Sequence, residues 1–194
     1  VYIFETLDPR RFRQFCEFAQ GPEIREKVTE FDQVLIYDLQ RRKITDLGGG
    51  PRQPSSLSQS PTDFLDSQLT SGSTLLLVKW VLDHRDAEGI TAFLVSVSQD
   101  DQVYKEESTV AVFTSTASVF SDVVRRFCYP ITVPPSTPDE AREEFRKIGD
   151  LLKDKPTLNT EVTDELIEAS KGLTLHDINT AALESIYQNR RFSI

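Results

Sequence analysis

The stretch Ser73-Thr-Leu-Leu-Leu-Val-Lys79 decides how the rest of the chain folds. Its centre, Leu75 to Val78, carries no charge and suits a strand that is buried on both faces. A second stretch of the same kind, Ser108-Thr-Val-Ala-Val-Phe-Thr114, follows further along the chain. Because uncharged strands are typical of sheets covered by helices on both sides, we predict that Leu75–Val78 and Thr109–Phe113 lie side by side at the centre of a parallel sheet.

The segments on either side of these two strands alternate between strand and helix patterns. Apolar helix faces follow Pro9 and Pro61, and two more are expected near Ile90–Val97 and Val119–Phe127. Further strands are expected at Val1–Phe4, at Gln33–Asp38, at Lys43–Leu47 as a hairpin partner, and at Pro130–Val133. Alternation of this kind predicts right-handed crossovers. We therefore expect an α/β fold, a three-layer parallel-sheet sandwich, over residues 1–135.

The pattern after Pro134-Pro135 is entirely helical. Thr137-Pro-Asp-Glu140 and Thr174-Leu-His-Asp177 both have the spacing of a capping box, in which the first side chain and the fourth satisfy backbone amides at a helix start. Pro156 and Gly172 interrupt the helices between them. We expect a small all-helical subdomain, resembling a lid, over residues 136–194.

Composition narrows the classes of function. The 194 residues hold 22 Lys and Arg against 31 Asp and Glu, a net charge of −9, so nucleic acid and anionic membrane are unexpected partners. Two cysteines give neither a disulfide framework nor a zinc cluster, and they fit a reducing cytoplasm. No apolar run is long enough for a membrane span. The first residue is Val1 and methionine is absent, which predicts a fragment of a longer chain.

Three stretches carry a resemblance to a known family. They are TVAVFTSTASVF (109–120), YPITVPPSTPDEAREEF (129–145) and GLTLHDINTAALESI (172–186). Together with the predicted sandwich and helical lid, they resemble AAA-type ATPases over most of the chain. The likeness is to the degenerate, non-hydrolysing N-terminal half of cyanobacterial, chloroplast and archaeal-type AAA proteins. It implies an AAA/P-loop-like fold without a phosphate loop, and a parent ATPase module beyond Ile194 that uses ATP and Mg²⁺.

The active parts of that family are missing from this segment. A phosphate loop needs a Lys-Ser/Thr pair after its glycines, whereas Gly48–Gly50 lead into Pro51-Arg52. The strand that should end in metal-holding acids ends in Lys79, a cation that repels a metal. Thr114–Thr116 could orient a water, but capping of the next helix explains these hydroxyls better. Leu173 occupies the position after Gly172 where the lid would supply an arginine.

The remaining reactive side chains give no catalytic constellation. His84 and His176 are far apart in the sequence and have no His or Cys neighbours at helical spacing. Cys16 lies on the apolar face of the first predicted helix, which indicates a core residue. Arg125-Arg126 beside Cys128 could lower the pKa of that thiol, although a lone cysteine without a base favours a structural role. We therefore expect no catalytic, cofactor-binding or metal-binding residue in this segment.

The sequence thus predicts a non-hydrolysing AAA-like regulatory or assembly module of a larger AAA ATPase. Its partners would be other proteins or the ATPase module of the same chain, and the parent could form a homo-oligomer. Partner binding is expected at Arg41, Arg42 and Lys43, which lead into a Gly/Pro/Ser-rich loop reaching Ser60.

Two alternatives stay open. The first is an ATP-binding and hydrolysing AAA domain whose phosphate loop lies outside the fragment. The second is a DNA-associated adaptor that uses the last helix around Asn179 and Arg190-Arg191, against which the net charge weighs.

Overall fold

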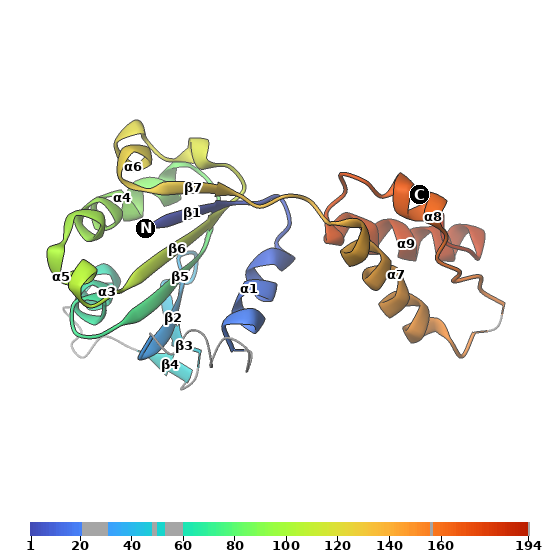
Figure 1. The fold of residues 1–194 in the computed structure, drawn as a ribbon, viewed down its shortest axis with the longest axis horizontal. Coiled ribbons are helices and arrows are strands. Elements are labelled where there is room, and N and C mark those ends of the chain that lie inside the picture. The colour runs from blue at the N-terminus through green and yellow to red at the C-terminus, as the bar shows by residue number, and fades with distance from the viewer. Residues whose placement is uncertain (21–30, 48–49, 53–59, 156, 194) are drawn as a thin grey trace. The chain divides into compact units, whose positions relative to one another are not determined.

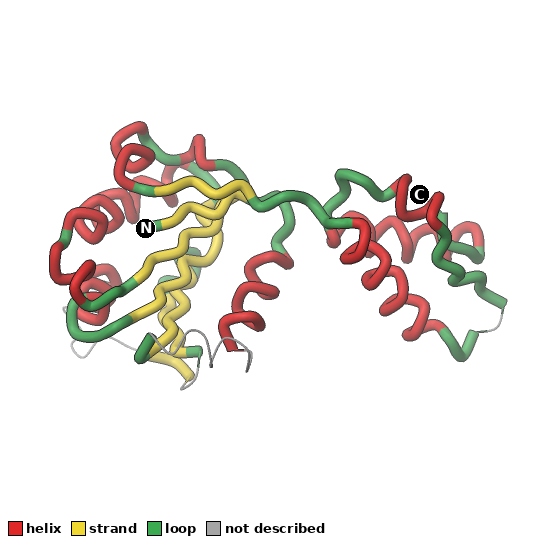
Figure 2. The backbone as a smooth tube through the Cα atoms, in the orientation of Figure 1, coloured by secondary structure: helices red, strands yellow, loops and turns green. Residues whose placement is uncertain are grey.

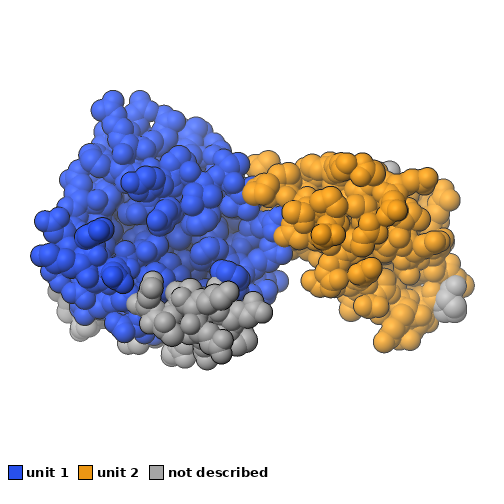
Figure 3. All heavy atoms as spheres, viewed as in Figure 1, with its two compact units in different colours: residues 1–6, 11–133 blue, residues 7–10, 134–194 orange. Residues whose placement is uncertain are grey.

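The chain forms two compact units. The structure is a computed structural model and describes residues 1–20, 31–47, 50–52, 60–155 and 157–193. Unit 1 comprises residues 1–6 and 11–133, and unit 2 comprises residues 7–10 and 134–194 (Figure 3). Unit 2 is therefore built from two separate pieces of sequence, which the sequence analysis did not anticipate.

A seven-stranded sheet forms the centre of unit 1, with the order β4-β3-β2-β5-β6-β1-β7 (Figure 1). The strands are β1 (Tyr2–Glu5), β2 (Gln33–Asp38), β3 (Lys43–Asp46), β4 (Gly50–Arg52), β5 (Thr74–Val81), β6 (Thr109–Thr114) and β7 (Tyr129–Thr132). β2, β5, β6, β1 and β7 run parallel to one another, and β5 and β6 pair at the centre from Leu75↔Thr109 onward. The predicted central pair is confirmed.

The hairpin expected after the second strand is also present. β3 pairs with β2 in antiparallel fashion, with Tyr37 opposite Ile44, and β4 extends the same edge of the sheet. Figure 2 shows these strands joining the parallel part of the sheet. The fold is therefore α/β with a mostly parallel sheet.

Helices lie on both faces of the sheet (Figure 1). Buried side chains of β2, β5 and β6 alternate between the faces, as strand geometry requires. One face packs against four helices: α3 (Pro61–Leu69), α4 (His84–Gln99), α5 (Asp101–Lys105) and α6 (Asp122–Phe127). The other face packs against α1 (Arg10–Gln20), where Phe12 contacts Phe113 edge-on at 5.0 Å between ring centroids.

The region between β6 and β7 differs from the sequence expectation. A single helix with a Val119–Phe127 stripe was predicted, but the chain forms a 3₁₀ turn, η1 (Ala117–Val119), followed by the short helix α6. Val124 is buried, whereas Val123 and Phe127 are exposed. The predicted stripe is confirmed at Val119 and Val124 and wrong at Val123 and Phe127, because the break at Phe120-Ser121 interrupts the continuous 3.6-residue pattern.

Unit 2 is helical in its described residues. It contains α7 (Pro138–Leu152), α8 (Asp164–Ala169) and α9 (Leu175–Asn189) around a core that includes Phe145, Ile178 and Phe192. Both predicted capping boxes are present, at Thr137 with Glu140 and at Thr174 with Asp177. Gly172 adopts φ +82°, the left-handed conformation that suits glycine between α8 and α9.

Candidate functional site at the carboxyl end of the sheet

The carboxyl ends of five strands lie along one edge of the sheet, because β2, β5, β6, β1 and β7 are parallel. The helix after β1 covers one face, whereas the helices after β5 and β6 cover the other. The crossover direction therefore changes between β1 and β6. Open α/β sheets bind ligands outside the carboxyl ends at such a switch point, so this edge is the first place to examine.

The link between β1 and α1 lacks the glycine-rich sequence of a phosphate-binding loop. It consists of the four residues Thr6 to Pro9 and contains no glycine. The Asp8 carboxylate is 3% exposed, and its Oδ1 accepts a hydrogen bond from the amide of Arg10, the first residue of α1, at 2.9 Å. A helix N-terminus favours an anion, and here the protein's own carboxylate supplies that negative charge.

Lys79 lies two residues before the end of β5 and pairs with an acid from the neighbouring strand. Lys79 and Asp38 are opposite each other in the β2–β5 register, and Lys79 Nζ is 3.3 Å from Asp38 Oδ2. The other carboxylate oxygen of Asp38 accepts a hydrogen bond from the Arg41 amide at 3.1 Å. The carboxylate nearest this strand end is thus engaged by a cation and by the backbone.

The backbone of β5 is irregular beside this ion pair. The register with β6 shifts between Val78 and Val81, which marks a β-bulge, and Trp80 adopts φ +45°. A bulky residue in this region is strained by about 1–3 kcal/mol, and bulges re-aim side chains near functional sites. The Thr114 hydroxyl lies 2.8 Å from the carbonyl oxygen of Val81 and fixes the strand beyond the bulge.

The hydroxyls at the end of β6 serve the fold. Thr114 is buried, and its Oγ1 contacts the Val81 carbonyl and the Thr116 carbonyl. Thr116 caps η1 by accepting a hydrogen bond from the Ser118 amide at 3.3 Å. The capping role predicted for this segment is confirmed at Thr116.

The acids after β5 organise the start of α4. Asp83 caps the helix by accepting a hydrogen bond from the Asp86 amide. Asp86 accepts hydrogen bonds from the Leu82 amide at 3.1 Å and from the Gln40 side chain at 2.6 Å, so it joins the loops that follow β5 and β2. Among the residues that the structure describes, no group of three or more His, Cys, Asp or Glu could hold a metal ion.

The three predicted partner-binding cations lie at this same edge. Arg41, Arg42 and Lys43 follow the carboxyl end of β2, form the tip of the β2–β3 hairpin, and are all exposed. Arg42 adopts φ +50°, which gives the turn its tight reversal. Most of the loop that follows, residues 48–49 and 53–59, lies outside the described residues. The tip is therefore a cationic projection beside the Lys79–Asp38 pair.

The cysteines and histidines do not form a reactive centre. Burial raises the pKa of the Cys16 thiol to about 11, with the Glu17 carboxylate adding to the shift and Lys79 opposing it. Burial also raises the pKa of Cys128, so the lowering suggested by Arg125-Arg126 is wrong: both arginines are exposed, while the thiol is buried. His84 Nδ1 lies 2.7 Å from the Val119 carbonyl oxygen, and His176 is exposed on unit 2.

Two features of this edge escaped the sequence analysis. Lys79 and Asp38 both end predicted strands, but the sequence analysis did not predict that these two strands are neighbours, which the structure shows. The bulge at Trp80 has no sequence signal that we recognise. Neither family models nor curated protein sequences gave a match to the chain. None of the described helices has the length and apolar composition that crossing a membrane would require.

Proposed function

We propose that the chain is a non-hydrolysing, AAA-like regulatory or assembly module of a larger AAA ATPase, acting in the cytoplasm through protein contacts. The helical unit 2 would correspond to the lid of such a module. ATP and Mg²⁺ would bind to the active module of the parent protein and not to this segment.

The state of the carboxyl edge is the observation that carries this proposal. Asp8 supplies the anion at the start of α1, and Lys79 with Asp38 neutralises the end of β5. The phosphates of a bound nucleotide would have to compete with the Asp8 carboxylate for the start of α1. Its Mg²⁺ would have to compete with Lys79 for the Asp38 carboxylate. Asp8, Lys79 and Asp38 are thus each engaged by groups of the chain itself, which suits a scaffold better than a phosphate-binding site.

The hairpin tip supports a role in protein contacts. Three consecutive exposed cations stand out in a chain with a net charge of −9. The backbone beneath them is held by the Asp38–Arg41 hydrogen bond. A cationic tip of this kind would attract an acidic surface on the ATPase module or on a partner protein.

Nucleotide titration tests the non-hydrolysing part of the proposal. Calorimetry with ATP and Mg²⁺ at about 1 mM should give no saturable heat. Saturable binding in the micromolar range would overturn the proposal and would favour a nucleotide-binding domain instead. Lys79→Ala and Asp38→Asn provide the matched controls, since a true nucleotide site at this edge would respond to both.

Charge reversal tests the protein-contact part in the parent ATPase. Changing Arg41, Arg42 and Lys43 to Glu should alter assembly or the ATPase rate while the fold is retained. The control changes Arg146, Lys147 and Lys153 on the helical unit to Glu, which produces the same net charge at exposed positions elsewhere. Equal effects from the two triple variants would show that only net charge matters and would contradict a specific role for the tip.

A further inference from the structure

The β-bulge in β5 decides which side chain at the end of this strand enters the core. Val78 and Val81 both belong to the hydrophobic cluster beneath α4, although a regular strand returns to the same face at every second residue. Regular alternation from Val78 would place Trp80 and Leu82 in that cluster instead. The register shift therefore moves Val81 into the core, and Trp80 takes up the extra residue at a strained φ of +45°.

Leu82 is the apolar side chain that the bulge leaves outside the core. It directly follows β5 at the carboxyl edge of the sheet and is 56% exposed. A leucine that stays in water contributes little to folding, and the neighbouring backbone is strained as well. Strained backbone is concentrated at sites where a protein binds another molecule. The bulge and the exposed leucine together thus indicate a contact at this edge.

Two hydrogen bonds place Leu82 beside the cationic hairpin tip. Asp86 Oδ2 accepts one from the Leu82 amide at 3.1 Å and one from the Gln40 side chain at 2.6 Å. Because both donors reach the same oxygen atom, Leu82 lies next to Gln40. Arg41 and Arg42 directly follow Gln40 in the turn, and both are exposed. We call Arg41, Arg42 and Leu82 the tip surface.

The two arginines of the tip surface have no acidic partner in the described part of the chain. Neither Arg41 nor Arg42 forms an ion pair there. The acids of the adjoining loops are engaged within the chain: Asp38 is held in an ion pair, and Asp83 and Asp86 accept hydrogen bonds from backbone amides. Complementary charge favours association, so an acidic molecule is the complement of this surface.

We propose that the tip surface binds an acidic protein segment that carries an apolar side chain. Carboxylates of the segment pair with Arg41 and Arg42, and its apolar side chain packs on Leu82. Arginine suits this task because its planar guanidinium can donate two hydrogen bonds to one carboxylate. The contact with Leu82 distinguishes such a segment from molecules that are only acidic. This inference rests on the protein-contact role proposed above and adds the chemistry of the partner.

Peptide binding tests the proposal, with the single tryptophan of the chain as a reporter. Trp80 lies two positions from Leu82, so its fluorescence responds to changes at the tip surface. The probe is a peptide of repeated Glu-Glu-Leu triplets, about twelve residues long. It should bind with a dissociation constant on the order of 100 µM, and a peptide of Glu-Glu-Ser triplets should bind about tenfold more weakly. If neither emission nor heat shows saturable binding up to about 1 mM, the proposal is wrong.

A leucine variant tests the apolar part of the contact. Leu82→Ser should weaken binding of the Glu-Glu-Leu peptide by about tenfold and should remove the preference over the Glu-Glu-Ser peptide. The matched control is Leu183→Ser on α9, where the leucine is 47% exposed, and it should bind as the unchanged chain does. Circular dichroism would verify that both variants are folded. Equal losses from the two variants would contradict a specific contact at Leu82.

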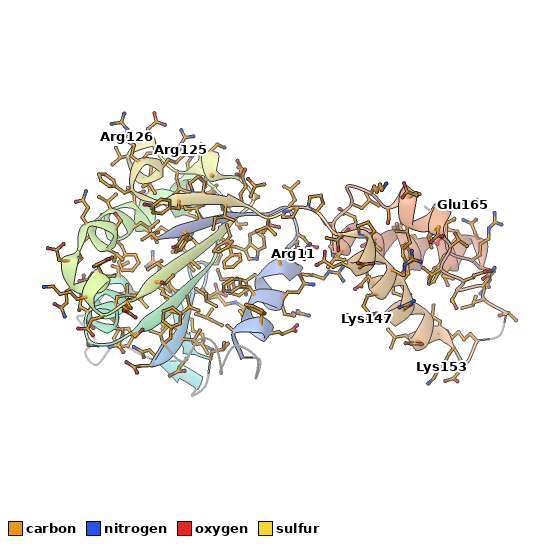
Figure 4. All side chains as sticks on the ribbon, viewed as in Figure 1. Arg11, Arg125, Arg126, Lys147, Lys153 and Glu165 are labelled. Carbon is orange, nitrogen blue, oxygen red and sulfur yellow. The ribbon has the colours of Figure 1, made fainter. Side chains whose placement is uncertain are left out.

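A charge variant tests the ionic part of the contact. Changing Arg41 and Arg42 to Glu should weaken binding of the Glu-Glu-Leu peptide by more than about tenfold. The control changes Arg125 and Arg126 to Glu, which alters the net charge of the same unit equally on the outer side of α6 (Figure 4). If the control weakens binding as much, the peptide responds only to net charge and the tip surface is not its site.

The parent ATPase separates this inference from the proposed function. Leu82→Ser should alter assembly or the ATPase rate in the same direction as the triple charge reversal of Arg41, Arg42 and Lys43. If the charge reversal has an effect and Leu82→Ser has none, the protein-contact role stands and the apolar contact is wrong. If neither variant has an effect, both proposals are wrong.

Discussion

Asp8 joins two helix starts within unit 2. One of its carboxylate oxygens accepts from the Arg10 amide, and the other accepts from the Leu175 amide at the start of α9, 2.8 Å away. Arg10 in turn donates to Glu144 at 2.8 Å, and Asn179 donates to the same Glu144 oxygen. This network explains why residues 7–10 belong to the helical unit although the chain on either side of them belongs to unit 1.

Replacing Asp8 by Ala should destabilise unit 2 by about 3 kcal/mol, because it leaves two amides without an acceptor in a buried place. Asp8→Asn keeps one acceptor oxygen and should cost about half as much. Urea unfolding followed by circular dichroism measures both changes. The control is Asp164→Ala, whose exposed side chain pairs with Arg142 and should cost less than about 1 kcal/mol. Similar losses for Ala at positions 8 and 164 would contradict a special role for Asp8.

The raised pKa of Cys16 predicts slow alkylation. With a pKa of about 11, about one thiol in a thousand is ionised at pH 8, and the thiolate is the reactive form. The rate of labelling by iodoacetamide, measured by peptide mass spectrometry, should rise about tenfold per pH unit up to about pH 10.

Two variants check the causes of the Cys16 shift. Glu17→Gln removes a negative charge and should lower the pKa, which speeds labelling, whereas Lys79→Gln removes a positive charge and should raise it, which slows labelling. A labelling rate that levels off near pH 9 in the unchanged chain would show that the thiol has an ordinary pKa.

At the scale of elements, the start of α9 offers a pH-dependent test. Hydrogen bonds from the Thr174 hydroxyl and amide hold the pKa of Asp177 below its ordinary value. The unfolded carboxylate keeps the ordinary pKa, so this contribution to stability is present above that value and is lost as the pH falls through the lowered folded value. The cap therefore stabilises α9 at neutral pH and weakens in acid.

Thr174→Ala should destabilise unit 2 by about 1 kcal/mol at neutral pH and should return the Asp177 pKa toward its ordinary value. Carboxyl chemical shifts measured against pH would report the pKa, and urea unfolding would report the stability. Thr180→Ala, at an exposed position inside the same helix, is the control: it should leave the Asp177 pKa unchanged and, because alanine is the better helix former, should stabilise unit 2 by about 0.5 kcal/mol. An unchanged Asp177 pKa in the Thr174 variant would contradict the capping explanation.

The elements that the sequence predicted well share a local cause. Uncharged strands such as Leu75–Val78 and capping boxes such as that of Thr137 carry their signal within a few residues, and the structure has both. The region around α6 was predicted less well, because burial there depends on how Val124 meets the sheet and not on a regular repeat. The Asp8–Leu175 hydrogen bond spans 167 positions, a separation at which no pattern in the sequence points to a partner.

At the scale of the whole molecule, the sequence indicates the architecture better than the activity. Parallel strands with helices on both faces follow from composition and periodicity alone, whereas many unrelated functions share such a fold. Among the candidate residues, the sequence placed Arg41, Arg42 and Lys43 at a turn, and in the structure Arg41 and Arg42 lie in the turn, Lys43 begins β3, and all three are exposed. Whether they bind a partner depends on chemistry outside the chain, which no periodicity encodes.

The division into two units predicts how truncated chains behave. A chain ending at Pro135 retains all of unit 1, so it should unfold cooperatively in urea, with the single tryptophan, Trp80, reporting on the sheet. A chain of residues 134–194 alone lacks Asp8 and Arg10 and is small enough to be marginal, so it should unfold with little cooperativity.

The same truncation separates the two roles of Asp8. In the chain ending at Pro135 the Leu175 amide is gone, and Asp8 retains the hydrogen bond from the Arg10 amide at the start of α1. Asp8→Ala should therefore cost about 1 kcal/mol in the truncated chain, the value of a helix cap, against about 3 kcal/mol in the full chain. Urea unfolding of the four proteins gives the difference as a thermodynamic cycle. An equal cost in both chains would mean that the bond to α9 adds nothing to stability, and residues 7–10 would then be a simple connection between β1 and α1.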